Sequence, residues 1–131
     1  MCIRDRFGII PLMKKFLKPL YWLGNSLKNL KALPGDVQDT FGYALHLAQI
    51  GEKHRAAKPL KGFSGSGVLE IVEDCDGNTY RAIYTVRFSE KIYVLHVFQK
   101  KSKSGIATPK QEITLVESRL KQILDMHKKG L

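Results

Sequence analysis

The sequence has few cysteines, few acidic residues and no long apolar run. Its cysteines, Cys2 and Cys75, belong to no CxxC motif or Cys/His cluster, which argues against a disulfide scaffold or a zinc site and favours reduced thiols in the cytosol. No apolar run reaches the roughly 20 residues that a transmembrane helix needs, so we expect no membrane association. Without internal repeats, 131 residues predict a single domain.

The most pronounced property of the chain is its positive charge. Lys and Arg number 22 against 12 Asp and Glu, a formal net charge of +10, while 44% hydrophobic and 26% charged residues are typical of a globular protein. Because lysines and arginines that neutralise phosphates release condensed counterions, nucleic acid is the leading candidate partner. An acidic partner protein, or a solvated basic surface with no partner, agrees equally well with this charge.

The N-terminal segment is not typical of a secretory signal. Pro11 interrupts its short apolar stretch, and no small-residue cleavage site follows. Met13 is followed directly by two lysines, so we expect translation to start there. The prediction is a non-native or disordered leader over residues 1–12 and one domain over residues 13–131.

Hydrophobic spacing and turn residues predict the element order β-α-α-β-β-β-α. The predicted elements are a strand at 17–23, helices at 26–33 and 35–50, strands at 68–74, 79–88 and 91–99, and a helix from Pro109 toward the C-terminus, opened by a Thr108/Gln111 capping box. The short turns between the last three strands require an antiparallel meander. We therefore expect an α+β domain with an antiparallel sheet and helices covering one face of it.

Alternation along the strand at 79–88 separates two kinds of side chain. Tyr80, Ala82 and Tyr84 fall on one face and are predicted core, whereas Arg81 and Arg87 share the other face, where no helix is expected. In the next strand, the same alternation predicts two sides. Ile92, Val94, His96 and Phe98 fall on one, and Tyr93, Leu95 and Val97 on the other.

These positions suggest a basic groove across the exposed sheet face. Arg81 would be surrounded by lysines from the preceding loop and from the segment after the last strand. The candidates are Lys58, Lys61, Lys100, Lys101 and Lys103. The alternatives are a solvated charged surface for the lysines and a structural salt bridge from Arg81 to Glu70 or Glu73. His96 is either a satisfied strand histidine or an acid/base group, since imidazole titrates near neutral pH.

Four motifs in order resemble the RelE/HigB toxin superfamily, most closely its phage-derived branch. They are KPLKG at 58–62, GVLEIV at 67–72, YRAIYTVR at 80–87 and YVLHVFQKKS at 93–102, within a resemblance that runs from about residue 18 to residue 127. The resemblance implies the toxin of a type II toxin-antitoxin pair. Such toxins cleave mRNA, usually on the translating ribosome, until a co-encoded antitoxin binds them.

The resemblance also implies the reaction and the partners. The 2′-hydroxyl attacks the adjacent phosphate without a metal or other cofactor. Cationic side chains stabilise the charge that develops on phosphorus. The expected partners are mRNA, ribosomal RNA and a helix-turn-helix antitoxin in the cytoplasm.

Family roles transfer to this chain position by position. Arg81 matches the strand arginine that contacts the scissile phosphate, and Lys61 matches a basic residue of the preceding loop. Lys100 and Lys101 align approximately with the basic residues after the last strand, and with Arg87 and Lys103 they are expected to bind RNA. Many members carry a Tyr or His near the C-terminus as general acid, where this chain has a helix, so His96 and Lys58 are the acid/base candidates instead.

Two other functions remain open from the sequence. One is a non-catalytic module of the same fold that binds RNA or an antitoxin helix. The other is a structural phage protein. An enzyme requires Arg81 to be available to substrate, whereas a structural role would pair Arg81 with a carboxylate.

Overall fold

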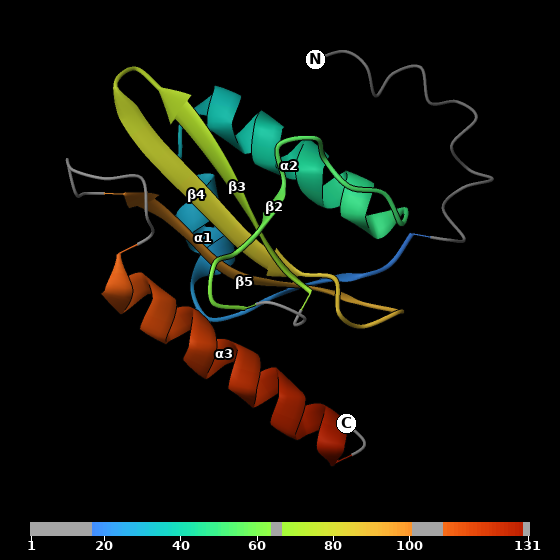
Figure 1. Cartoon of the computed structure of the whole chain (residues 1–131). Coiled ribbons are helices and arrows are strands. Elements are labelled where there is room, and N and C mark those ends of the chain that lie inside the picture. The colour runs from blue at the N-terminus through green and yellow to red at the C-terminus, as the bar shows by residue number, and fades with distance from the viewer. Residues whose placement is uncertain (1–16, 64–66, 101–108, 130–131) are drawn as a thin grey trace.

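The computed structural model describes residues 17–63, 67–100 and 109–129 (Figure 1). Its elements are β1 (Leu20–Trp22), α1 (Ser26–Lys31), α2 (Gly35–Gln49), β2 (Lys58–Pro59), β3 (Val68–Cys75), β4 (Asn78–Thr85), β5 (Ile92–Lys100) and α3 (Lys110–Lys128). The α+β class and the predicted element order are confirmed, with the short strand β2 added. The proposed leader and Thr108 of the capping box lie outside the described residues. None of the helices in these ranges has the length and apolar character to cross a membrane.

The strands form one sheet in the order β1-β5-β4-β3-β2. Strands β3, β4 and β5 form the predicted antiparallel meander, while β1 runs parallel to β5. Asp76 and Gly77, with φ of 51° and 81°, connect β3 to β4 in the left-handed backbone region that a tight hairpin turn requires. The turn brings Asn78 opposite Cys75 and thereby fixes the register of the whole β3–β4 pair.

One face of the sheet packs against α1 and α2. The predicted apolar positions of α2 are all buried there, namely Val37, Phe41, Ala44, Leu45 and Ala48. They contact the predicted core positions of β4, Tyr80, Ala82 and Tyr84, in one hydrophobic cluster. This confirms the alternation that assigned these β4 residues to the core.

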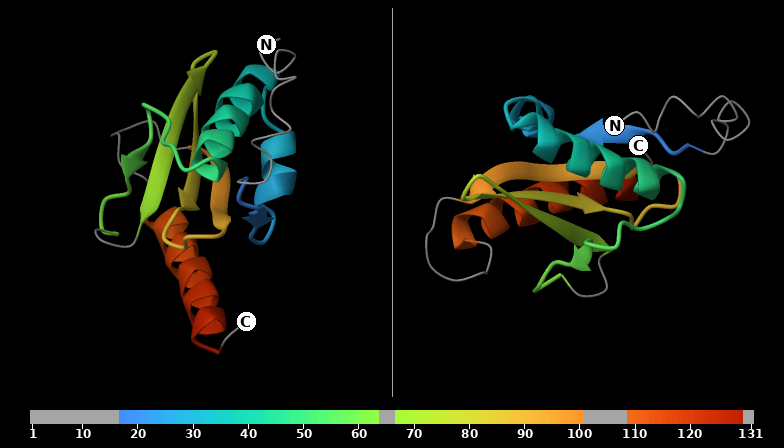
Figure 2. Two further views of the ribbon diagram at one scale, coloured as in Figure 1. Left: turned by 90° about the vertical axis from the view of Figure 1, so that its right-hand side faces the viewer. Right: turned by 90° about the horizontal axis from the view of Figure 1, so that it is seen from above.

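The opposite face is covered by α3, as Figure 2 shows. Val116, Leu120 and Ile123 of α3 pack in a second cluster with Leu95 and Phe98 of β5. The prediction that helices cover only one sheet face is therefore wrong. The physical reason is that β5 is apolar on both sides, so both of its faces have to be removed from water.

A bulge in β5 changes which side chains share a face. Ile83 pairs with His96 while the next residue, Tyr84, pairs with Val94, so Leu95 is the extra residue. Leu95 packs against α3, and His96 contacts α3 as well. The strict alternation predicted for this strand is therefore wrong beyond Val94, because the extra residue shifts the pattern by one position.

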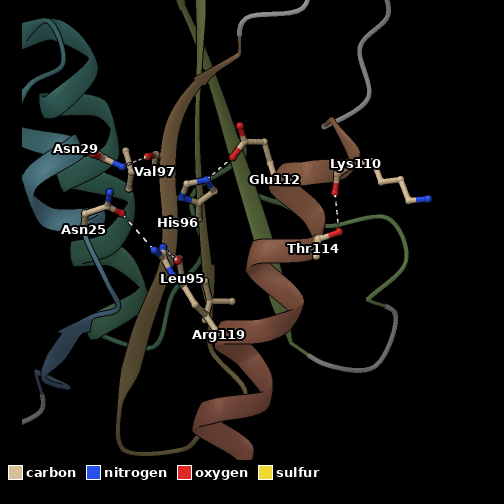
Figure 3. Close-up of polar contacts among 9 residues, drawn as sticks. All are labelled: Asn25, Asn29, Leu95, His96, Val97, Lys110, Glu112, Thr114 and Arg119. Atoms are coloured by element: carbon tan, nitrogen blue, oxygen red, sulfur yellow. Dashed lines mark hydrogen bonds and ion pairs between the residues drawn. The ribbon is translucent and has the colours of Figure 1, made fainter.

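Beyond the end of β1, side chains form the hydrogen bonds along the outer edge of β5 (Figure 3). Arg119 Nη1 of α3 donates to the Leu95 carbonyl at 2.7 Å, and Asn29 Nδ2 of α1 donates to the Val97 carbonyl at 2.9 Å. Arg119 Nη2 also donates to Asn25 Oδ1 at 3.2 Å, so the Asn25 side chain binds α3 and does not cap α1. These bonds tie both helix layers to one edge and satisfy carbonyls that a neighbouring strand would otherwise cover.

We expect Arg119→Met to destabilise the protein by about 1–3 kcal/mol, because the buried Leu95 carbonyl loses its donor. The matched control is Lys121→Met on the exposed side of the same helix, which should change the free energy of unfolding by less than about 0.5 kcal/mol. Urea denaturation followed by circular dichroism measures both. Equal stability of the two variants would contradict this role of Arg119.

Candidate functional site

The part of the α3-side face that α3 leaves uncovered forms a hollow of about 570 Å³. Its wall consists of side chains from β2, β3 and β4, the end of β5 and the loop before β2. They are Ala56, Lys58, Glu70, Val72, Asp74, Thr79, Arg81 and Lys100. Three of these eight residues, Lys58, Arg81 and Lys100, are among those predicted from the sequence to surround a basic groove.

Strand register explains why these side chains meet. Val72 lies opposite Arg81, and Thr79 lies opposite Lys100. Lys58 of β2 lies opposite Glu70. Because alternate residues of a strand point to the same face, each strand contributes every second side chain to the hollow.

Arg81 is the most buried cation of the hollow. Its side chain is 5% exposed, and its Nη1 donates to Glu70 Oε2 at 2.6 Å. The expectation that Arg81 stands unneutralised on an uncovered surface is therefore wrong, and the salt bridge to Glu70 that was its rival is present. Glu70 is the diagonal cross-strand neighbour of Arg81, close enough for two long side chains to meet.

The charges that line the hollow leave a small positive excess. Lys58, Arg81 and Lys100 contribute three positive charges, and Glu70 and Asp74 contribute two negative ones. Thr79 Oγ1 donates to Asp74 Oδ1 at 2.8 Å, which orients that carboxylate at the end of the hairpin. Among the described residues, no group of three His, Cys, Asp or Glu is placed to bind a metal ion. The three cationic side chains of the hollow offer nitrogen donors to an anion.

The remaining predicted cations lie elsewhere. Lys61 is exposed in the turn after β2, and Arg87 is exposed beyond the end of β4; neither lines the hollow. The prediction that Arg81 and Arg87 share a strand face is wrong, because β4 ends at Thr85. The Thr85 hydroxyl accepts the backbone N–H of Arg87 at 3.1 Å and supports this departure from the sheet. Lys101 and Lys103 lie outside the described residues.

His96 lies on the hollow's side of the sheet but beneath α3 (Figure 3). Its Nε2 and Glu112 Oε1 are 2.5 Å apart, and its ring stacks on Phe98 with the centroids 4.7 Å apart. Burial lowers the pKa of His96, while the Glu112 carboxylate acts in the opposite direction and Arg119 acts with burial. The Nε2 atom of His96 is engaged with the Glu112 carboxylate, and His96 is not among the residues that line the hollow.

His127, the histidine near the C-terminus, packs in an aromatic cluster. Its Nε2 lies 3.0 Å from the Tyr93 hydroxyl, and its ring stacks on Phe88 with centroids 4.0 Å apart. These contacts fasten the last turn of α3 to the sheet. His127 does not line the hollow either.

Sequence reasoning gave Glu70 only the role of a possible salt-bridge partner and did not consider Asp74 or Thr79. All three line the hollow. The signal was the same alternation that placed Arg81, since positions 70, 72 and 74 are every second residue of one strand. To place these positions beside Arg81, the alternation has to be combined with the register between β3 and β4, which the turn at Asp76 and Gly77 sets.

We expect stability to decline from about pH 7.5 to about pH 5.5 in part because of His96. The folded protein holds the pKa of His96 below its value in the unfolded chain, so the unfolded chain binds the proton more readily and stability is lost as the pH falls. His96→Gln retains a donor for Glu112 and should show a shallower decline in urea denaturation. Identical pH slopes in the two proteins would contradict the assignment to His96.

Two comparisons relate the chain to known proteins, and a third finds no match. Residues 28–121 match the family described as phage-derived protein Gp49-like (DUF891). Free Escherichia coli toxin RelE, in a form with two arginines changed to alanine, is a similar solved structure. It has a TM-score of 0.50 and 18% identity over 66% of this chain and 87% of that one. No curated protein matches the chain significantly.

The family match extends from α1 into the second half of α3 and includes all strands that form the hollow. The structural likeness, at low identity, shows the shared fold. The chain therefore belongs to the phage-derived Gp49-like family and has the fold of the toxin RelE.

Proposed function

We propose that this protein is the toxin of a type II toxin-antitoxin pair and an endoribonuclease that cleaves mRNA in the hollow between β2 and the end of β5. The observation that carries the proposal is the convergence of Arg81, Lys58 and Lys100 beside the carboxylate of Glu70. The membership in a phage-derived family with a RelE-like fold supports it.

The reaction that fits these groups is attack of a 2′-hydroxyl on the adjacent phosphate. As the pentavalent phosphorane forms, its oxygens gain negative charge beyond that of the ground state. Guanidinium and ammonium groups already in place stabilise this charge more than the starting phosphodiester, and that difference lowers the barrier. Arg81 is the proposed contact to the phosphate, with Lys58 and Lys100 adding charge from either side.

Proton transfer needs an acceptor for the 2′-hydroxyl and a donor for the 5′-oxygen that leaves. Glu70 is the carboxylate nearest Arg81 and is the proposed acceptor; Lys58, exposed at the rim, is the proposed donor. His96, the other candidate from the sequence, is covered by α3 and engaged with Glu112. It would reach substrate only if the first turns of α3 moved away.

The ribosome is the proposed site of action in the cytoplasm. A hollow with few acid/base groups depends on a substrate held in line for attack, and an mRNA fixed in the decoding site satisfies that need. Exposed cations outside the hollow, Lys61 and Arg87 among them, would contact ribosomal RNA phosphates. Such contacts position the protein without reading sequence.

A non-catalytic module that binds RNA or an antitoxin helix is the second candidate. The Glu70–Arg81 ion pair favours it, since a structural role for Arg81 predicts such a partner. The two functions differ in a measurable way: both require the cations of the hollow, but only the enzyme breaks a phosphodiester bond.

Induced expression of the protein should arrest growth and produce cuts in translated messages, and Arg81→Ala should abolish both. The loss follows because the cation proposed to contact the phosphate is removed. Growth curves and mapping of mRNA 5′ ends measure the outcome. Circular dichroism and urea denaturation establish that Arg81→Ala is folded, since the change also removes the partner of Glu70.

The matched control is Lys28→Ala, which removes one exposed cation from α1 on the opposite side of the sheet. This variant should remain toxic. If wild type and Arg81→Ala prove equally harmless, the catalytic function is wrong. RNA binding without any cut would then identify the non-catalytic module.

The partner proposal has its own test. An open reading frame next to this gene should encode a helix-turn-helix antitoxin that co-purifies with the chain and suppresses its toxicity. Co-expression with a tag on the neighbouring protein measures the complex. A neighbouring protein that neither binds nor protects would contradict the toxin-antitoxin assignment.

A further inference from the structure

The Glu70–Arg81 ion pair lies inside the hollow proposed to receive the substrate. The Glu70 side chain is 14% exposed and that of Arg81 is 5% exposed, so the pair is largely withdrawn from water. Its 2.6 Å contact joins Arg81 Nη1 to Glu70 Oε2. Any phosphate that binds Arg81 therefore meets a guanidinium that already holds an anion.

Carboxylates and phosphodiesters compete for the same donors. Both present two oxygens that match the planar fork of a guanidinium. A buried guanidinium left without an anion is strongly unfavourable, so exchange of one anion for another is easier than separation followed by binding. The hollow contains a second cation, Lys58, close enough to Glu70 to take part in such an exchange.

Lys58 is the group that could receive Glu70 after displacement. It lies directly opposite Glu70 in the β2–β3 register, and side chains at such positions are close neighbours on the sheet face. Lys58 is exposed, so its ammonium is free to turn toward the displaced carboxylate. The released Glu70 would thus retain a cationic neighbour within the hollow.

We propose that Glu70 occupies Arg81 as a stand-in for the substrate phosphate in the free protein, and that an RNA phosphate displaces it toward Lys58. The proposal rests on the proposed function, in that RNA enters this hollow. Glu70 then sets the affinity for RNA, because each binding event has to break its contact with Arg81. Glu70 thereby excludes anions that bind Arg81 weakly, whereas a ligand that makes further phosphate contacts in the hollow displaces Glu70.

The test measures binding separately from cleavage. The probe is a fluorescent RNA oligonucleotide with 2′-O-methyl groups throughout, which lacks the attacking hydroxyl. Glu70→Gln should bind it about tenfold more tightly than wild type in an anisotropy titration, since the competing charged contact is gone. Glu73→Gln is the matched control: it removes one negative charge from the same strand, and Glu73 lies outside the lining of the hollow.

A second pair of variants tests whether the effect passes through Arg81. In an Arg81→Gln background, Glu70→Gln should tighten binding no more than Glu73→Gln does. Glu70→Asp is the substitute if Glu70→Gln does not fold, because a shorter carboxylate keeps the charge but weakens its contact with Arg81. It should shift affinity in the same direction by a smaller factor.

The outcomes separate the exchange from the proposed function. If wild type binds the oligonucleotide and Glu70→Gln binds no more tightly than Glu73→Gln, the exchange is wrong while RNA binding stands. The exchange is also wrong if Glu70→Gln raises the affinity for the oligonucleotide by the same factor in the wild-type and in the Arg81→Gln background. If wild type binds no RNA at low salt, the proposed function fails and the exchange fails with it.

Discussion

The ion pair between Arg81 and Glu70 is the interaction on which the functional argument depends. It brings two side chains from adjacent strands into a largely buried contact. The rest of the hollow is lined by two lysines, a threonine, an aspartate, an alanine and a valine. A buried guanidinium requires an anion, and a carboxylate is the one that the fold provides. The same requirement makes the position suitable for a phosphate, so a structural pair and a binding site need not be alternatives here.

The position of α3 decides how much of this face is available. The bond from Arg119 to the Leu95 carbonyl and the His96–Glu112 pair attach α3 to β5. A second bond from Arg119, to Asn25, attaches α3 to the turn before α1. Under α3 most of the face is apolar and buried, with Leu95 and Phe98 packed against the helix. Beyond it, toward β2 and the hairpin, the face is polar and hollowed. The bulge at Leu95 alters the part of the face beneath α3, because it places His96 there beside Leu95.

Much of the fold could be predicted from local pattern. The apolar spacing of α2 and the core residues of β4 were predicted at the positions where they are buried. The same alternation failed in β5, where a single extra residue moved His96 to the side of α3. It also failed at Arg87, because the strand ended two residues earlier. Periodicity assumes an uninterrupted strand, and neither a bulge nor a strand end has a local sequence signal strong enough to show the break.

By itself, the sequence determined the order of the elements, the apolar faces of α2 and β4 and the excess of positive charge, since each of these depends on residues close together in the chain. Only the tertiary structure decided that α3 covers the face opposite to α1 and α2, that Glu70 meets Arg81, and that Lys58 and Lys100 reach the same hollow while Lys61 does not. These outcomes depend on strand register and on which side a helix packs. They are set by the total burial and charge pairing of distant segments, which no local pattern records.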